Sequence, residues 1–268
     1  MSSSAHRLAS LTLCLAVACV EKSPMGPGSE VVTVHAVLNP AERVQHISVT
    51  RSPDGAGFGQ SVSGATVSLV TPDGVTLPAT EVTIAPDYSY YPGVPGPQYD
   101  IATDRVEVGR AYRLRVVLPN GRVVEGEATP PATTPVAVAS ERRLDRNVDT
   151  LRLSWPRVPG ARAYEVRVFP KRDSLPWYGE YVTYVDTSFT LAGAARSRGT
   201  QIFMEGIRYD LVVSAVDANY YSYYAFESDQ YTGTALPTSL RGGEGVFGAL
   251  VPIVRMSITV EGVDPRLR

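Results

Sequence analysis

Residues 164–168 read Tyr-Glu-Val-Arg-Val, so every second residue of this stretch is apolar. The same alternation occurs in residues 151–155, Leu-Arg-Leu-Ser-Trp, and in residues 209–215, Tyr-Asp-Leu-Val-Val-Ser-Ala. Successive side chains of a β-strand point to opposite faces, so this period predicts strands with one buried face. No stretch of twelve or more residues shows the apolar period of a helix. We therefore expect an all-β fold.

The first half of the chain shows the same period-two pattern in shorter runs. Strands are expected at residues 31–38, 44–51, 65–71, 81–85, 112–118 and 122–128. Asn120-Gly121 separates the last two of these runs. Because both residues tolerate positive φ, the pair favours a type I′ hairpin turn.

A run of prolines and threonines divides the chain. Residues 129–135 read Thr-Pro-Pro-Ala-Thr-Thr-Pro, and proline lacks the N–H group that a central strand needs. We place the domain boundary there, since each side is long enough to bury its own core. The sequence predicts two β-sandwich domains, over residues 31–130 and 131–268.

The amino terminus has the layout of an export signal. Residues 8–18 form an apolar run of eleven residues after one arginine, Arg7. As a helix this run would be about 16 Å long, roughly half of a bilayer core, so it predicts a signal peptide over residues 1–18. Residues 16–19, Ala-Val-Ala-Cys, resemble a bacterial lipobox, which implies lipid attachment at Cys19. The alternative is an ordinary secretory signal cut after Ala18.

A flexible tether follows the predicted lipid attachment site. Residues 20–30 are polar and contain proline and glycine, so we expect residues 19–30 to hold a folded body off a membrane. Cys19 is the single cysteine left after the predicted cleavage, so disulfides are not expected to stabilise the domains.

The composition excludes several classes of function. The chain of 268 residues has 25 Lys and Arg against 27 Asp and Glu, for a net charge of −2 without a basic run. Nucleic-acid binding needs a basic face, so no nucleic-acid partner is expected. With three histidines and two cysteines, a zinc site or a Cys/His catalytic pair is nearly excluded by counting.

Neither a metal nor a cofactor is expected. Residues 242–248 are rich in glycine, but they lack the Gly-Lys-Ser/Thr ending of a phosphate-binding loop. They are interpreted as tight backbone before a last strand at 251–260, with Phe247 in the core. Asp217 and Asn219, near Glu227 and Asp229, offer oxygen ligands for calcium without EF-hand spacing, so ordinary turn acids are the favoured interpretation.

The second half of the chain resembles a fibronectin type III domain. The pattern L-x-L-x-W, a Pro-rich turn, Y-x-V-x-V and Y-x-L-x-V-x-A covers about residues 136–260. The resemblance implies that Trp155 is the core tryptophan of the second strand. It also implies that Tyr209 is a tyrosine corner whose hydroxyl returns to the backbone. Sandwiches of this kind serve many roles, so the resemblance implies a fold and no function.

Two further resemblances extend over the rest of the chain. Residues 62–69 and 108–116 are similar to the regulatory-type β-sandwich found beside carboxypeptidases and on outer-membrane receptors. The whole mature chain resembles a family of envelope lipoproteins known as domain of unknown function 4249. Leu38-Asn39-Pro40, a Tyr-rich stretch and the Gly-rich residues 241–249 carry that likeness. Members are often encoded beside TonB-dependent outer-membrane receptors, which implies a role in uptake.

Aromatic clusters are the candidate surface for a ligand or partner, because tyrosine and tryptophan combine a large rigid ring with a polar tip. The alternative is that half of these rings face a core or a domain interface. The candidates are Tyr88, Tyr90, Tyr91, Trp177, Tyr178, Tyr220, Tyr221, Tyr223 and Tyr224.

Enzyme activity is not expected. The mature histidines, His35 and His46, both lie in predicted strands, and there is no Gly-x-Ser-x-Gly elbow. We therefore expect a non-catalytic protein, lipid-anchored to the outer membrane, that serves as an accessory or ligand-capture subunit of a TonB-dependent receptor. A surface adhesin that binds a polysaccharide or peptide through Tyr-rich loops is the alternative, and a hydrolase is the least favoured.

Overall fold

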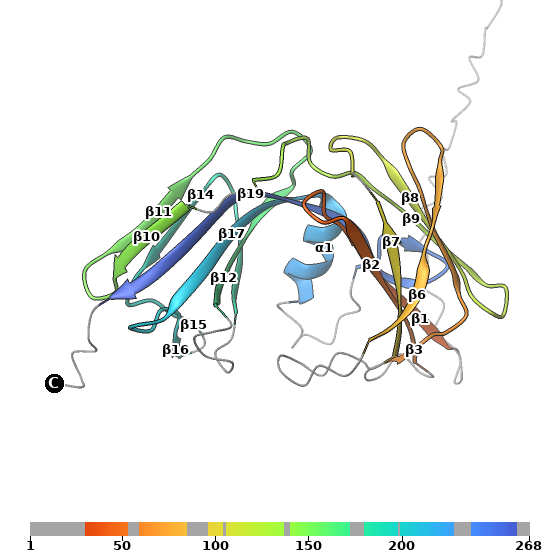
Figure 1. Cartoon of the computed structure of the whole chain (residues 1–268), viewed down its shortest axis with the longest axis horizontal. Coiled ribbons are helices and arrows are strands. Elements are labelled where there is room, and N and C mark those ends of the chain that lie inside the picture. The colour runs from red at the N-terminus through yellow and green to blue at the C-terminus, as the bar shows by residue number, and fades with distance from the viewer. Residues whose placement is uncertain are drawn as a thin grey trace, which may run out of the picture.

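The fold is seen in a computed structural model that describes residues 30–52, 59–84, 96–103, 106–136, 140–171, 180–197, 199–227 and 237–261. These residues form nineteen strands and one helix. The predicted all-β class is confirmed: the molecule consists of two β-sandwiches that share one continuous sheet (Figure 1). No helix within the described residues is long and apolar enough to cross a bilayer.

The first sandwich packs two sheets face to face. One sheet has the order β19-β1-β2-β7-β6, with β3 paired to β2, and the other has the order β18-β9-β8-β4-β5. Valine and leucine side chains from alternate positions of these strands form its core. The strands are β1 (Val31–Leu38), β2 (Val44–Ser52), β3 (Gln60–Ser61), β4 (Thr66–Val70), β5 (Thr76–Pro78), β6 (Thr80–Ile84), β7 (Gly96–Ala102), β8 (Tyr112–Val117) and β9 (Val123–Ala128).

The second sandwich places the β11-β14 pair over a larger sheet with the order β13-β12-β17-β19, to which β10 adds at β19. The small β15-β16 pair lies at one end. Its strands are β10 (Ser140–Asp145), β11 (Thr150–Ser154), β12 (Ala163–Pro170), β13 (Tyr181–Val185), β14 (Ser188–Ala192), β15 (Arg196–Ser197), β16 (Thr200–Gln201) and β17 (Arg208–Val216). The helix α1 (Ala218–Glu227) and the strands β18 (Leu240–Arg241) and β19 (Glu244–Glu261) complete the chain.

Strand β19 belongs to both sandwiches. Its first residues pair in parallel with β1, from Thr33 opposite Glu244 to Leu38 opposite Ala249. Its later residues pair antiparallel with β17 and parallel with β10. Eighteen residues of extended chain are roughly 60 Å long. Figure 1 shows this strand running from one sandwich into the other, with α1 beneath the junction.

The position of β18 and β19 differs from the predicted division of the chain, which assigned all of residues 131–268 to the second sandwich. Leu240 pairs with Gly126 of β9, and Phe247 and Ala249 lie in the core of the first sandwich. The last strand also begins at Glu244 rather than at residue 251. Because Gly245 and Gly248 pair with Val34 and Val37 of β1, they extend the strand instead of leading into it.

Close backbone approach explains two of these glycines. Gly245 has a φ of +102°, and a Cβ there would lie 2.2 Å from the carbonyl oxygen of Val34. A Cβ on Gly248 would lie 2.8 Å from the backbone nitrogen of Tyr220, where α1 rests on the strand. Phe247, between them, is 1% exposed, as expected for a core residue. Only glycine lets β1 and α1 contact β19 at these positions.

Buried tyrosines bond back to the backbone in both sandwiches. Trp155 and Tyr209 lie in the second core, and the N–H of Met204 donates to the Tyr209 hydroxyl oxygen at 2.9 Å. In the first sandwich the N–H of Glu107 donates to the Tyr112 hydroxyl oxygen at 2.7 Å, also five residues upstream. The predicted core tryptophan and tyrosine corner are confirmed, and the first sandwich has a matching corner.

The β8–β9 hairpin forms at the predicted place with a different turn. The N–H of Gly121 donates to the carbonyl oxygen of Leu118, so Pro119 and Asn120 are the central residues. Proline fixes φ near −65°, which excludes type I′. Gly121 follows with a φ of +83°, as in a three-residue loop closed by a glycine bulge.

The contact between β1 and β19 can be tested with Gly245→Ala. The added methyl combines positive φ with a backbone clash, so the free energy of unfolding should fall by about 3 kcal/mol or more. Gly121→Ala is the matched control, because its φ is also positive and nothing lies within 4 Å of the added Cβ. It should cost about 1 kcal/mol. Urea unfolding measures both, and equal costs would contradict the close approach.

Candidate functional site

Several of the predicted site residues lie outside the described residues. These are the lipid attachment residue Cys19, with the signal peptide and most of the tether, and five of the aromatic candidates: Tyr88, Tyr90, Tyr91, Trp177 and Tyr178. The remaining candidates, Tyr220, Tyr221, Tyr223 and Tyr224, lie in α1.

The Tyr-rich segment forms a helix rather than the predicted loop. Asp217 precedes α1, and its Oδ1 accepts a hydrogen bond from the backbone N–H of Tyr220 at 2.8 Å, which caps the amino terminus. Residues three apart share a helix face, so Tyr220 and Tyr223 point the same way. Tyr220 is 1% and Tyr223 4% exposed. The prediction that these two rings form a contact surface is wrong, because α1 buries them against the sheet.

Helix α1 is hydrogen-bonded to the first sandwich and to the shared strand β19. The side-chain amide of Asn219 donates to the carbonyl oxygens of Glu127 at 2.8 Å and Phe247 at 2.9 Å. The Tyr223 hydroxyl lies 2.9 Å from Nε2 of His35 on β1, and burial lowers the pKa of that histidine. These contacts fix the helix over the junction of the two sandwiches, so the outward rings of α1 have a defined position.

A buried ion pair lies under the helix. Tyr164, Val166 and Val168 of β12 face the core, so the intervening Glu165 and Arg167 face α1 on the other side of the sheet. The Glu165 side chain is 1% exposed, and the Arg167 side chain is 39% exposed. A charged residue this deeply buried needs a full set of partners.

Glu165 and Arg167 have such partners. Nε of Arg167 donates to Oε1 of Glu165 at 2.5 Å, and the hydroxyls of Tyr220 and Tyr184 donate to Oε2 at 2.6 and 3.1 Å. Nη2 of Arg167 also donates to the Tyr220 hydroxyl oxygen at 3.0 Å. Its Nη1 lies 3.3 Å from Oε1 of Glu180. We refer to these five side chains as the Glu165 network.

The network holds its groups in defined protonation states. Burial works to lower the pKa of Arg167, but Tyr220 and Glu165 oppose it and raise that pKa overall. Burial, followed by the charge of Glu165, raises the pKa of Tyr184 and of Tyr220 above the usual range for tyrosine. The guanidinium is therefore charged and both hydroxyls are protonated at neutral pH.

A groove opens beside the network, with a volume of about 520 Å³. The Tyr184 and Tyr221 rings meet edge to face, with centroids 5.6 Å apart, and the Arg162 guanidinium lies 4.9 Å from the Tyr221 centroid. Two of the predicted surface residues, Tyr221 and Tyr224, line this groove. We call it the aromatic groove; its lining is Arg167, Val182, Thr183, Tyr184, Tyr221, Tyr224 and Ala225.

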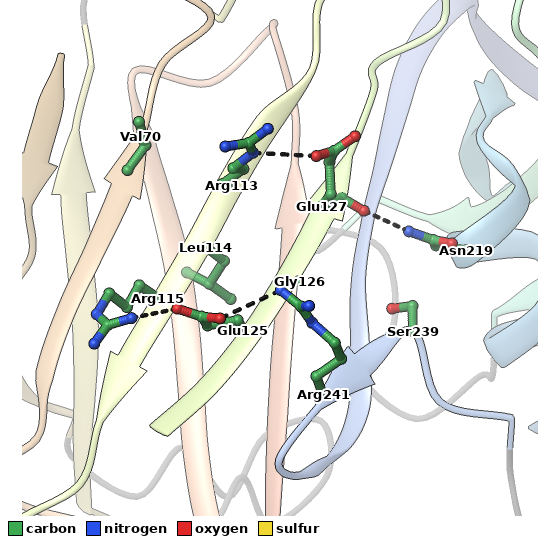
Figure 2. A pocket seen from close by; sticks show the side chains of 10 residues that line it. All are labelled: Val70, Arg113, Leu114, Arg115, Glu125, Gly126, Glu127, Asn219, Ser239 and Arg241. Carbon is green, nitrogen blue, oxygen red and sulfur yellow. Dashed lines mark hydrogen bonds and ion pairs between the residues drawn. The ribbon is translucent and has the colours of Figure 1, made fainter. Parts of the chain in front are cut away.

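A second groove, of about 720 Å³, runs along the outer face of the first sandwich. Figure 2 shows Arg113 and Arg115 of β8 facing Glu127 and Glu125 of β9, while Arg241 reaches Glu125 from β18. These five charged side chains are 36% to 87% exposed. Exposed ion pairs of this kind contribute little to the free energy of unfolding, so this face has the properties of an ordinary solvated sheet.

The structure gives Asp217 a role as the cap of helix α1. Its Oδ1 is occupied by the helix cap. Over the described ranges, no three His, Cys, Asp or Glu side chains gather as metal ligands would. Asp229 lies outside the described residues.

Comparison with known protein families assigns the chain. The model of one family, described as domain of unknown function DUF4249, matches residues 21–251. The chain belongs to the DUF4249 family. The family inferred from the sequence is thus confirmed, and its description names no activity. No curated protein matches this DUF4249 chain.

Three solved structures show a limited similarity to the DUF4249 chain. The chicken CNTN1 FN1-FN3 domains are 11% identical with a TM-score of 0.24, over 86% of this chain and 65% of theirs. The BSP domain of a biofilm associated protein is 14% identical with a TM-score of 0.25, over 88% of this chain and 30% of that one. DIP-gamma IG1+IG2 is 11% identical with a TM-score of 0.19, over 86% and 99%. At these scores none of the three bears on function.

Sequence reasoning missed Arg167 and Tyr184 in the lining of the groove, Glu165 beneath it, and Arg162 against the Tyr221 ring. Glu165 and Arg167 alternate with core residues, and that pattern is typical of a solvated strand face. The signal available was a pair of opposite charges two residues apart in one strand. It becomes informative only when α1 is known to cover that face.

The burial of Glu165 predicts a large effect for Glu165→Ala. Removing the carboxylate leaves Arg167 and two buried hydroxyls without their main partner, so the free energy of unfolding should fall by about 3 kcal/mol. Glu125→Ala is the control, since Glu125 also contacts two cations, Arg115 and Arg241, but in solvent. It should cost less than about 1 kcal/mol. Urea unfolding compares the two, and similar costs would argue against a buried network.

The helix cap predicts a pH dependence of stability. Burial raises the pKa of Asp217 to about 6, against backbone hydrogen bonds that lower it, from an ordinary value of 3.8. Folding thus favours the protonated carboxyl, and its contribution to stability is lost as the pH rises from 3.8 to about 6. Asp217→Asn keeps a cap oxygen without the charge. As the pH rises across this interval, the free energy of unfolding of the variant should increase by about 3 kcal/mol relative to that of wild type.

Urea unfolding of both proteins at several pH values across the interval measures this gain. A constant cost of the amide cancels from the comparison. Parallel stability profiles would contradict the raised pKa of Asp217.

Proposed function

We propose that this protein is a non-catalytic, lipid-anchored protein of the cell envelope that captures a ligand in the aromatic groove and serves a TonB-dependent outer-membrane receptor as an accessory subunit. The observation that carries the proposal is the groove itself. Partly exposed tyrosine rings line a groove beside a hydrogen-bonded ion pair, and aromatic lining with a few fixed polar groups is typical of a binding site.

The chemistry of the groove supports binding rather than catalysis. Glu165 accepts hydrogen bonds from Arg167, Tyr184 and Tyr220, so it is not positioned to take a proton from a substrate. The raised pKa values of Tyr184 and Tyr220 keep both hydroxyls protonated, which disfavours them as bases or nucleophiles.

The histidines support the same proposal. His35 packs against Tyr223, and its pKa is lowered by burial. His46 is paired with Asp100 on an exposed strand of the first sandwich. Neither contributes to the lining of the aromatic groove, so the groove lacks the histidine base that a serine nucleophile would need.

Attachment to the envelope is proposed from the leader sequence. The apolar run at residues 8–18 overlaps the lipobox-like residues 16–19. Cys19, directly after the run, is the residue proposed to be lipidated. Residues 20–30 then give the two sandwiches reach from the membrane surface. The receptor partner is proposed from the resemblance to envelope lipoproteins encoded beside such receptors.

A surface adhesin is the second candidate, and the tyrosine rings of the same groove favour it, since aromatic rings suit contacts with a polymer. The two candidates differ in their partners. An accessory subunit remains bound to a large barrel protein in gently solubilised membranes, whereas an adhesin does not need one.

Cys19→Ala and wild type, purified side by side from the native host, test the proposal. Wild type should fractionate with membranes and co-elute with a TonB-dependent barrel, while Cys19→Ala should become soluble. The control Cys14→Ala alters a cysteine inside the predicted signal peptide and should behave as wild type. Equal fractionation of wild type and Cys19→Ala would overturn the anchor. Anchored protein without a barrel would leave the adhesin as the better proposal.

A further inference from the structure

We infer that the ligand of the aromatic groove is an uncharged carbohydrate. This inference rests on the proposed function, which places ligand capture in that groove. It follows from the charge balance of the groove, from the hydrogen bonds already made by its one lining cation, and from the exposure of its rings.

Among the described residues of the groove and the network beneath it, two arginines are matched by two glutamates. Arg162 and Arg167 supply two positive charges, and Glu165 and Glu180 supply two negative charges within the same cluster. A carboxylate or phosphate on the ligand would meet attraction from the arginines and repulsion from the two glutamates. The surroundings therefore give an ionised ligand no net electrostatic advantage.

Arg167 is not available to clamp an anion. Recognition of a carboxylate or phosphate usually uses two N–H groups of one guanidinium side by side. In Arg167, Nε and Nη2 both point to the Glu165 carboxylate, Nη2 also reaches the Tyr220 hydroxyl, and Nη1 faces Glu180. The edge that an anion needs is already occupied by the protein's own carboxylates.

A cationic ligand is disfavoured for a similar reason. Cations bind aromatic grooves over the face of a ring, within about 6 Å of its centroid. The Arg162 guanidinium already lies 4.9 Å from the Tyr221 centroid. The Glu165 carboxylate, 1% exposed and hydrogen-bonded to three side chains, is closed to a second cation.

The remaining features of the lining match a sugar. Tyr184 and Tyr221 are partly exposed, and the ring surface that Arg162 does not cover is apolar, as the C–H face of a pyranose requires for packing. The Thr183 hydroxyl lies in the same lining, and it can pair with a sugar hydroxyl without requiring a charge. The volume of about 520 Å³ lies within the usual range for ligand sites, about 300–1,000 Å³.

Binding of soluble polymers to the full chain, purified in a sugar-free detergent, tests the inference by biolayer interferometry. The neutral probes are dextran, laminarin, soluble starch and xyloglucan. The charged probes are polygalacturonate and chitosan, and a tryptic digest of casein represents peptides. At least one neutral polymer should bind. Its Kd should change by less than about twofold between about 50 and about 500 mM NaCl, because no ion pair forms with the ligand.

Variants place the binding in the groove. Tyr221→Ala should raise the Kd about tenfold. Tyr221→Phe keeps the ring, so its Kd should stay within about threefold of the wild-type value. Arg113→Ala, on an exposed arginine of the second groove, is the matched control and should bind as wild type. Circular dichroism and the urea midpoint show whether Tyr221→Ala is folded; if it is not, the Tyr221→Phe and Arg113→Ala results decide.

The other outcomes overturn the inference in distinguishable ways. Binding only of polygalacturonate, of chitosan or of peptides, with loss in Tyr221→Ala, shows a groove ligand of another class and leaves the proposed function standing. Neutral binding that is lost in Arg113→Ala and kept in Tyr221→Ala moves the site to the second groove. If no polymer binds while the barrel still co-elutes from native membranes, the carbohydrate assignment is wrong and the receptor role survives.

Discussion

The parallel pairing of β1 with β19 is the interaction on which the rest of the structure depends. It joins the first strand of the chain to the last strand, and it makes one continuous sheet out of two sandwiches. Tandem domains joined by a linker move relative to each other by default. Here a backbone ladder crosses the junction, so bending between the sandwiches would break strand hydrogen bonds. Gly245 is the residue that permits this ladder, since a side chain there would meet the carbonyl of Val34.

The position of α1 follows from that shared strand. Gly248 exposes the backbone of β19, and Tyr220 lies directly on it. With the helix seated there, the Tyr220 hydroxyl reaches Glu165 on β12, and Asn219 reaches Glu127 on β9. The helix therefore contacts the first sandwich through the Asn219 side-chain amide and the second through the Tyr220 hydroxyl. A change in the angle between the sandwiches would disturb both contacts, so the ion pair beneath the helix also depends on the pairing of β1 with β19.

Local patterns predicted the strands well, because alternation is a property of neighbouring residues. β1 was predicted over residues 31–38 and is observed as Val31–Leu38. The start of β19 was missed because residues 242–248 are rich in glycine, which is rare in strands unless another backbone comes close. The closeness of Val34 is a long-range fact that no local pattern contains. The prediction of a type I′ turn is wrong for a local reason, because Pro119 and not Asn120 takes the first central position of the turn.

Helix α1 and the Glu165 network could not be predicted from the sequence, for two different reasons. Ten residues that include five aromatic rings have little apolar periodicity, because tyrosine is apolar on its ring and polar at its tip. The polar positions of β12 look solvated until a residue 55 positions away in sequence covers Glu165. Burial of a charge is thus a tertiary property here, visible only once the helix is placed.

The insertion that carries α1 is not needed to close the second sandwich. β17 and β19 are direct neighbours in the sheet, and antiparallel neighbours can be joined by a turn of a few residues. Instead, α1 and β18 stand between them in the chain, and the helix buries two of its tyrosines while two others line the groove. The outer face of a sheet offers little depth by itself. Here α1 packs on that face, and its side chains form one side of the groove while β13 forms the other. The groove exists because the connection is longer than the topology requires, and long connections on a rigid scaffold are where binding sites concentrate.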